Sequence, residues 1–183
     1  MEYLFPDEIR VLAIDPTTRG IGFAVLEGPE RLVDWGVKQA GEDKNAECVE
    51  IVRELIDRYR RHALVIEDAQ DESSLRRERV GELLEDIRRM ARERRVKVLD
   101  VTPNRIRQAF APKKDVIAAA IAGRFPELQP RLPKMRTLRM SEQYKMPVFD
   151  AMSFALTFFY QTKRKKLSQE RQAVREAIKK DAA

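Results

Sequence analysis

Five apolar runs of strand length, in a fixed order along the chain, constrain the fold more than any other feature. Three come in succession, Val11–Asp15, Gly20–Leu26 and Arg31–Val37, and the segments between them have turn composition. The other two, Ala63–Glu67 and Val96–Val101, alternate with segments of helical periodicity. Strands joined by turns predict an antiparallel meander, whereas strand–helix alternation predicts parallel strands. We therefore predict an α/β fold with a mixed five-stranded sheet.

Amphipathic segments between and after these strands predict the helices. Residues 44–60 and 74–95 each carry an apolar stripe opposite a charged face. Two short helices at about 103–110 and 114–124 follow the last strand, then a loop rich in Pro and Arg from 126 to 145. A core helix is expected from about 147 to 162. The usual size of domains favours one domain over residues 1–162 and a basic, helical tail over 163–183.

Several functional classes are excluded by composition. No run approaches the roughly 20 apolar residues of a membrane span, and the N-terminus lacks the order of a signal peptide, so we expect a cytoplasmic protein. Cys48 is the only cysteine and lies on the apolar stripe of its helix, which is typical of a core residue. His62 is the only histidine and stands among arginines. Neither a histidine-based zinc site nor a Ser-His-Asp triad can be assembled.

Two carboxylates stand at the ends of predicted strands. Asp15 ends the first strand and precedes a Pro-Thr-Thr-Arg-Gly turn, while Glu67 directly follows four apolar residues. Each has a plain structural alternative, because aspartate is common in turns and a strand often ends on a charged residue.

A third carboxylate, Asp150, lies in a helix that is apolar almost all round. A buried carboxylate needs a partner or a metal. The polar residues Asp150, Ser153, Thr157 and Gln161 also fall on one narrow stripe of this helix. Placement in the first helical turn, where an acidic group complements the helix dipole, explains the aspartate but not the stripe.

Three carboxylates at the ends of two strands and the start of a closing helix can converge at one point of such a sheet. Oxygen ligands suit Mg²⁺ or Mn²⁺, and two such ions can promote phosphodiester hydrolysis. Since histidine and cysteine are scarce, an oxygen-ligated metal is the catalytic option that this sequence retains.

Four segments resemble motifs of the RuvC-type Holliday-junction resolvases. The first strand and its turn, Val-Leu-Ala-Ile-Asp-Pro-Thr-Thr-Arg-Gly, are similar to the first motif, and Leu-Val-Ile-Glu is similar to the fourth-strand motif. Val-Thr-Pro-Asn-Arg-Ile-Arg-Gln-Ala and Phe-Asp-Ala-Met-Ser-Phe-Ala-Leu match the two later motifs in family order. The resemblance implies a ribonuclease-H-like fold, a homodimer and Mg²⁺- or Mn²⁺-dependent cleavage of branched DNA, with two ions per site held by Asp15, Glu67 and Asp150.

One position departs from the family pattern. Three residues before the last aspartate the family has an acidic residue or histidine, and this chain has Pro147. Glu142 is the first candidate for a replacement ligand, with Asp68 and Asp115 as others. The chain can be active with a replacement, active with three ligands, or inactive and still able to bind DNA.

The net charge of +6 is concentrated near the C-terminus. Residues 161–183 hold eight basic and three acidic side chains, a local charge of +5 that suits phosphate binding but is also common in solvated helices. A basic loop at 131–139 is the second expected phosphate-binding segment. The nucleic-acid-binding candidates are Arg105, Arg107, Lys113, Lys114, Arg136, Arg139, Lys163, Arg164, Lys165 and Lys166.

Other functions remain open from the sequence. Structured RNA is an alternative substrate, because YqgF-type nucleases belong to the same superfamily. A non-catalytic junction-binding or scaffold protein would use the same basic segments. An actin-like sugar kinase or ATPase is disfavoured, because it needs a second domain for which 183 residues leave no room.

Overall fold

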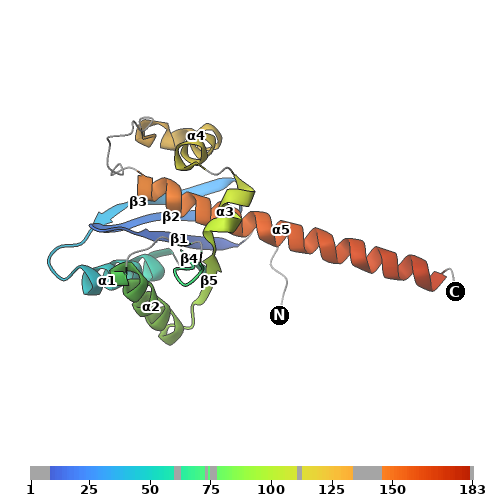
Figure 1. Ribbon diagram of the computed structural model, residues 1–183, viewed down its shortest axis with the longest axis horizontal. Helices are drawn as coiled ribbons and strands as arrows, with labels where there is room; N and C mark the ends of the chain where they lie inside the picture. Colours follow the sequence, from blue (N-terminus) through green and yellow to red (C-terminus); the bar gives the residue numbers. More distant parts are fainter. Residues whose placement is uncertain are drawn as a thin grey trace.

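The computed structural model of the chain describes residues 9–59, 63–72, 74, 78–110, 113–133 and 146–181 (Figure 1). The side chains of residues 166, 171 and 173–181 are not part of that description. Across these ranges, no helix is both long enough and apolar enough to cross a membrane.

A mixed five-stranded sheet forms the centre, with the strand order β3-β2-β1-β4-β5. Strand β1 pairs antiparallel with β2 and parallel with β4, so it is the point at which the sheet changes from meander to parallel strands. The predicted α/β fold with a mixed five-stranded sheet is therefore confirmed. The strands are β1 (Arg10–Pro16), β2 (Gly20–Glu27), β3 (Arg31–Gln39), β4 (Ala63–Glu67) and β5 (Lys97–Val101).

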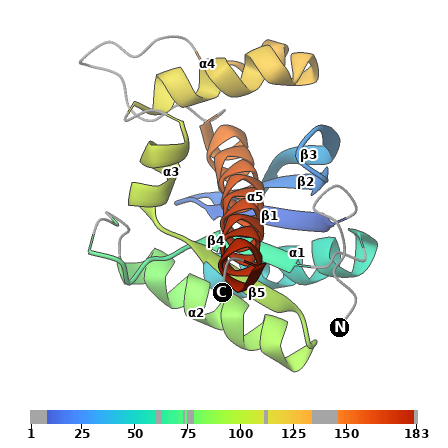
Figure 2. The same ribbon diagram turned by 90° about the vertical axis from the view of Figure 1, so that its right-hand side faces the viewer.

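Helices cover both faces of the sheet. Helices α1 and α2 lie on one face, whereas α5 lies on the other and is covered in turn by α4 (Figure 2). The short helix α3 packs beside α5. The helices are α1 (Lys44–Tyr59), α2 (Glu78–Glu93), α3 (Pro103–Ala109), α4 (Lys114–Arg124) and α5 (Met146–Asp181), with a 3-10 helix η2 (Pro126–Arg131) after α4.

Alternation along the central strands divides the core into two clusters. Leu12 and Ile14 of β1 pack in the cluster that contains the buried residues of α1 and α2. Val11 and Ala13 pack in the cluster that contains α4 and α5. Successive side chains of a strand point to opposite faces, so residue parity in β1 assigns each side chain to one cluster.

One segment differs from the sequence prediction and another confirms it. The start of the predicted loop 126–145 is the 3-10 helix η2, because Leu128 is fully buried and anchors a turn that Pro126 opens. The core helix expected at 147–162 continues as helix through the basic tail, as predicted, and runs without a break to Asp181. Figure 1 shows its C-terminal part extending away from the rest of the protein.

Candidate active site

Three carboxylates are buried on the described part of the chain, and they are the three that the sequence singles out. Asp15 is 2% exposed, Glu67 is 7% exposed and Asp150 is 9% exposed. Ser153 and Thr157, from the polar stripe of α5, are also buried. Burying a carboxylate is costly unless charge or hydrogen bonds compensate, so this set needs an explanation beyond packing.

Asp15 and Glu67 lie at the same level of two neighbouring parallel strands. The register pairs Leu12 with Leu64 and Ala13 with Val65, and continuing it by two residues brings Asp15 beside Glu67. Both share strand parity with the residues that pack under α5. Their carboxylates are therefore directed to the α5 face, at the carboxyl ends of β1 and β4.

The first turn of α5 sits over the strand that pairs with Asp15. Gly22 is the antiparallel partner of Asp15, and a Cβ added to Gly22 would lie 2.5 Å from the carbonyl carbon, carbonyl oxygen and Cβ of Pro147. Only glycine permits this approach. Asp150 follows Pro147 by three residues, about one helical turn, so it lies in the part of α5 that directly follows this contact with β2.

The turn after Asp15 is fastened to the opposite helices. The backbone N–H and the hydroxyl of Thr17 both donate to the carbonyl oxygen of Gly20, at 2.8 and 3.1 Å. The Arg79 guanidinium donates to the carbonyl oxygen of Thr17 (2.9 Å) and to Oδ1 of Asn45 (2.7 Å). These bonds fix the backbone that positions Asp15.

Two of the carboxylates have partners that sequence reasoning did not identify. Ser74 donates its hydroxyl to Oε1 of Glu67 at 2.9 Å. The Lys114 ammonium lies 2.7 Å from Oδ2 of Asp150, and its side chain is 49% exposed. A cation from α4 thus reaches the proposed metal-binding edge.

The donor set is compatible with a hard divalent cation, which prefers several carboxylate oxygens. In the described ranges, no three His, Cys, Asp or Glu side chains lie close enough together to hold an ion. The ion pair with Lys114 supplies one reason, because an ammonium on Asp150 substitutes for a cation there.

Pro147, at the position where the sequence pattern expects a fourth ligand, packs against Gly22. Glu142 lies outside the described residues. Asp68 accepts a hydrogen bond from the backbone N–H of Gln70 at 3.1 Å. Asp115, in the first turn of α4 beside Lys114, has a buried Oδ1 without a hydrogen-bond partner. Of the two described candidates, Asp115 is the one with an unsatisfied oxygen.

The basic candidates divide into two groups by position. Arg105, Arg107 and Lys113 are exposed on α3 and at the start of α4, elements that pack on the α5 side of the sheet. Lys163, Arg164 and Lys165 are exposed on the extended part of α5. Arg136, Arg139 and the side chain of Lys166 lie outside the description.

The remaining titratable features lie away from this edge. Cys48 is fully buried, as predicted, and burial raises the pKa of its thiol. Tyr59 donates its hydroxyl to Oδ2 of Asp34, and burial followed by this hydrogen bond raises the pKa of Tyr59. His62 is outside the described residues.

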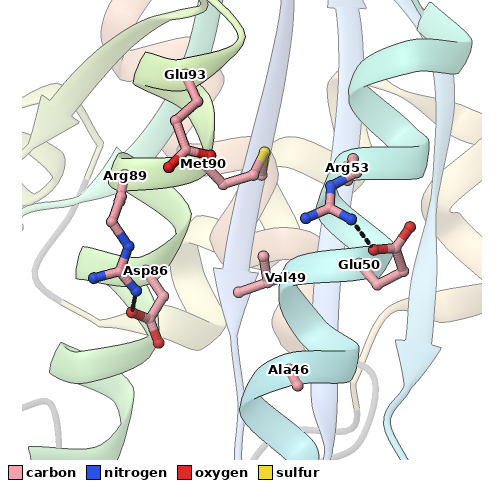
Figure 3. A pocket seen from close by; sticks show the side chains of 8 residues that line it. All are labelled: Ala46, Val49, Glu50, Arg53, Asp86, Arg89, Met90 and Glu93. Carbon is pink, nitrogen blue, oxygen red and sulfur yellow. Dashed lines mark hydrogen bonds and ion pairs between the residues drawn. The ribbon is translucent and has the colours of Figure 1, made fainter.

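A shallow cleft of about 380 Å³ lies between α1 and α2 and is separate from the carboxylates (Figure 3). Val49 and Met90 contribute its apolar surface. Its charged side chains include two pairs internal to a helix, Arg53 with Glu50 and Arg89 with Asp86.

Comparison with known proteins finds similar proteins by structure alone. No protein-family model and no curated protein matches the sequence. RuvC of Thermus thermophilus, solved in complex with a Holliday junction substrate, aligns with a TM-score of 0.61 at 23% identity and covers 84% of this chain and 95% of its own. The yeast mitochondrial Holliday junction resolvase Ydc2 gives 0.57 at 12% identity, covering 86% of this chain and 80% of its own. The fowlpox virus resolvase, solved with Holliday junction DNA, gives 0.54 at 12% identity, covering 84% and 99%. The chain therefore has the ribonuclease-H-like fold found in these resolvases.

Proposed function

We propose that this chain is a metal-dependent endonuclease that hydrolyses phosphodiester bonds in branched DNA, with Asp15, Glu67 and Asp150 as its metal ligands. The observation that supports the proposal most is the burial of these three carboxylates, with Asp15 and Glu67 directed to the α5 face by the register of β1 and β4. Carboxylates held near one another repel, and a bound divalent cation would relieve that repulsion. The structural neighbours solved with Holliday junctions support a four-way junction as the substrate.

The three carboxylates would hold Mg²⁺ or Mn²⁺, two ions per site. When bound, such ions activate a water molecule and stabilise the leaving oxygen. Ser74 restrains Glu67 through its hydrogen bond, and the Thr17–Gly20 turn restrains Asp15. Lys114 neutralises Asp150 before the metal binds, and its half-exposed ammonium can then pair with a substrate phosphate.

Basic residues around this edge would bind the DNA backbone. Arg105, Arg107 and Lys113 are exposed on the α5 side and are available for phosphate contacts, which carry no sequence preference. Residues 1–162 would form the nuclease domain, and residues 163–183 a basic segment that adds phosphate contacts. A homodimer is part of the proposal, because symmetric cutting of a four-stranded junction needs two sites related by a two-fold axis.

A non-catalytic junction-binding protein is the second candidate, and two observations favour it. Pro147 stands at the position where the family has a metal ligand, and it is fixed against Gly22. The Lys114 ammonium pairs with Asp150 and already compensates its negative charge, so Asp150 does not require a metal ion for that purpose.

Cleavage of a synthetic four-way junction, compared with linear duplex, single strand and structured RNA, separates these functions. We expect cleavage of the junction in Mg²⁺ or Mn²⁺ and none in EDTA. Cleavage of structured RNA alone would identify an RNA nuclease. Junction binding without cleavage under any metal would replace the catalytic proposal with the binding protein.

A further inference from the structure

The C-terminal part of α5 extends beyond the domain that it helps to build. Among the described side chains of the helix, Phe159 is the last that is buried, and those after Thr162 are exposed. Nineteen further residues, 163–181, continue the helix. At 1.5 Å per residue they extend about 28 Å, as Figure 1 shows in outline. We call residues 163–181 the arm.

The arm carries a high density of unneutralised positive charge near its base. No acidic residue occurs between Asp150 and Glu170 in the sequence. Lys163, Arg164 and Lys165 are exposed, and none is paired with a carboxylate in the described ranges. The Arg164 guanidinium lies over the Tyr160 ring at 5.7 Å, which holds it extended along the helix.

The distribution of this charge fits a nucleic-acid duplex better than a flat anionic surface. Successive residues of a helix point about 100° apart, so Lys163, Arg164 and Lys165 present charge on different sides of the arm. A helix in the major groove has phosphates on both sides, because that groove is about 12 Å wide.

The arm is also rigidly joined to the proposed active site, because one continuous helix carries both. Asp150 and Lys163 are 13 residues apart, or about 20 Å along the axis. A duplex bound along the arm is therefore held at a fixed distance from Asp150. The arm spans the length of about eight base pairs at 3.4 Å each.

We infer that the arm binds a duplex leg of the substrate and makes binding depend on the length of that leg. This inference rests on the proposed function, since a leg exists only on a branched nucleic acid. Tyr160 and Leu167, 47% and 45% exposed and seven residues apart, suggest helix pairing with a second copy instead. The charge of the arm argues against pairing with a second copy. Residues 163–181 hold eight basic and three acidic side chains, so the arms of two copies would repel each other.

The test measures binding in EDTA, where the proposed cleavage is switched off. The probes are hairpin-capped four-way junctions with legs of about 6 or about 20 base pairs, shorter or longer than the arm. The test variant is Lys163→Gln/Arg164→Gln/Lys165→Gln. The matched control, Lys44→Gln/Arg58→Gln/Arg92→Gln, removes the same charge from exposed positions on α1 and α2. A chain that ends at Thr162 is the second test variant.

On long legs we expect the arm variant to bind at least tenfold more weakly than the control, with a log–log salt slope smaller by about 2 to 3. On short legs the two should bind within twofold of each other. Equal binding by arm variant and control on long legs, or the same deficit on short legs, overturns the inference. So does a wild-type protein that binds long and short legs equally and forms a dimer in light scattering that Leu167→Lys dissociates, because a second copy would then occupy the arm. Normal leg-length dependence without cleavage in Mg²⁺ would instead refute the catalytic proposal and leave the arm's role standing.

Discussion

Replacing Gly22 with alanine tests how α5 is held over the carboxylates. The added Cβ would lie 2.5 Å from three atoms of Pro147, two of them backbone, whereas carbon atoms prefer about 3.5–4.0 Å. The first turn of α5 must therefore move by about 1 Å. Overpacking of this kind costs about 1–3 kcal/mol, which exceeds the roughly 0.5–1 kcal/mol gained by removing a glycine from a strand.

Thermal unfolding followed by circular dichroism measures this cost. The net cost of about 0.5–2.5 kcal/mol, at about 2–4 °C per kcal/mol for a chain of this size, should make Gly22→Ala lower Tm by roughly 1–10 °C. Gly81→Ala and Gly123→Ala are matched controls, because an added Cβ meets no atom within 4 Å at either helical position. Both controls should leave Tm unchanged or raise it. A Gly22→Ala protein that unfolds at the wild-type temperature would refute the proposed packing of Pro147 against β2.

Three further predictions follow from individual contacts. Lys114→Met removes the ammonium that would compete with a metal ion for Asp150, so adding Mg²⁺ or Mn²⁺ should raise Tm more in this variant than in the wild type. An equal rise in Tm would contradict competition at Asp150. The buried Cys48, whose thiol has a raised pKa, should resist a thiol reagent at neutral pH until the protein unfolds, and fast labelling of the native protein would disprove its burial. Tyr59 has a folded-state pKa above its unfolded value near 10, so its contribution to stability is present below pH 10 and is lost as the pH rises through the folded pKa. Tyr59→Phe should therefore make Tm fall less steeply at alkaline pH than in the wild type. An unchanged alkaline fall in Tm would count against this contribution.

The sheet could be predicted because each strand is specified by residues that are neighbours in the sequence. Each strand is an apolar run bounded by turn residues, and parity alone decides which face Val11 and Leu12 occupy. The same parity places Asp15 and Glu67 on one face, once β1 and β4 are neighbours. Burial of Asp150 was expected from the apolar residues around it.

What the sequence did not predict depends on contacts between distant residues. Lys114 and Asp150 are 36 positions apart, and Lys114 looks like any exposed lysine until α4 is placed over α5. Gly22 and Pro147 each have an ordinary local explanation, in a strand and at a helix start, yet their contact sets the height of α5 above the sheet. The 3-10 helix at 126–131 was missed because Leu128 alone anchors it.

The most direct test of the central claim is Mg²⁺-dependent cleavage of a four-way junction by Asp15→Asn beside the wild type. Asparagine keeps the size of the side chain but removes the charge that would bind the metal. We expect cleavage to be abolished, junction affinity to be equal or higher, and Tm to be unchanged or higher because carboxylate repulsion is relieved. Wild-type cleavage by Asp15→Asn, with a Tm lowered by the loss of about 1 kcal/mol, would show that Asp15 is a structural turn residue and would contradict the account.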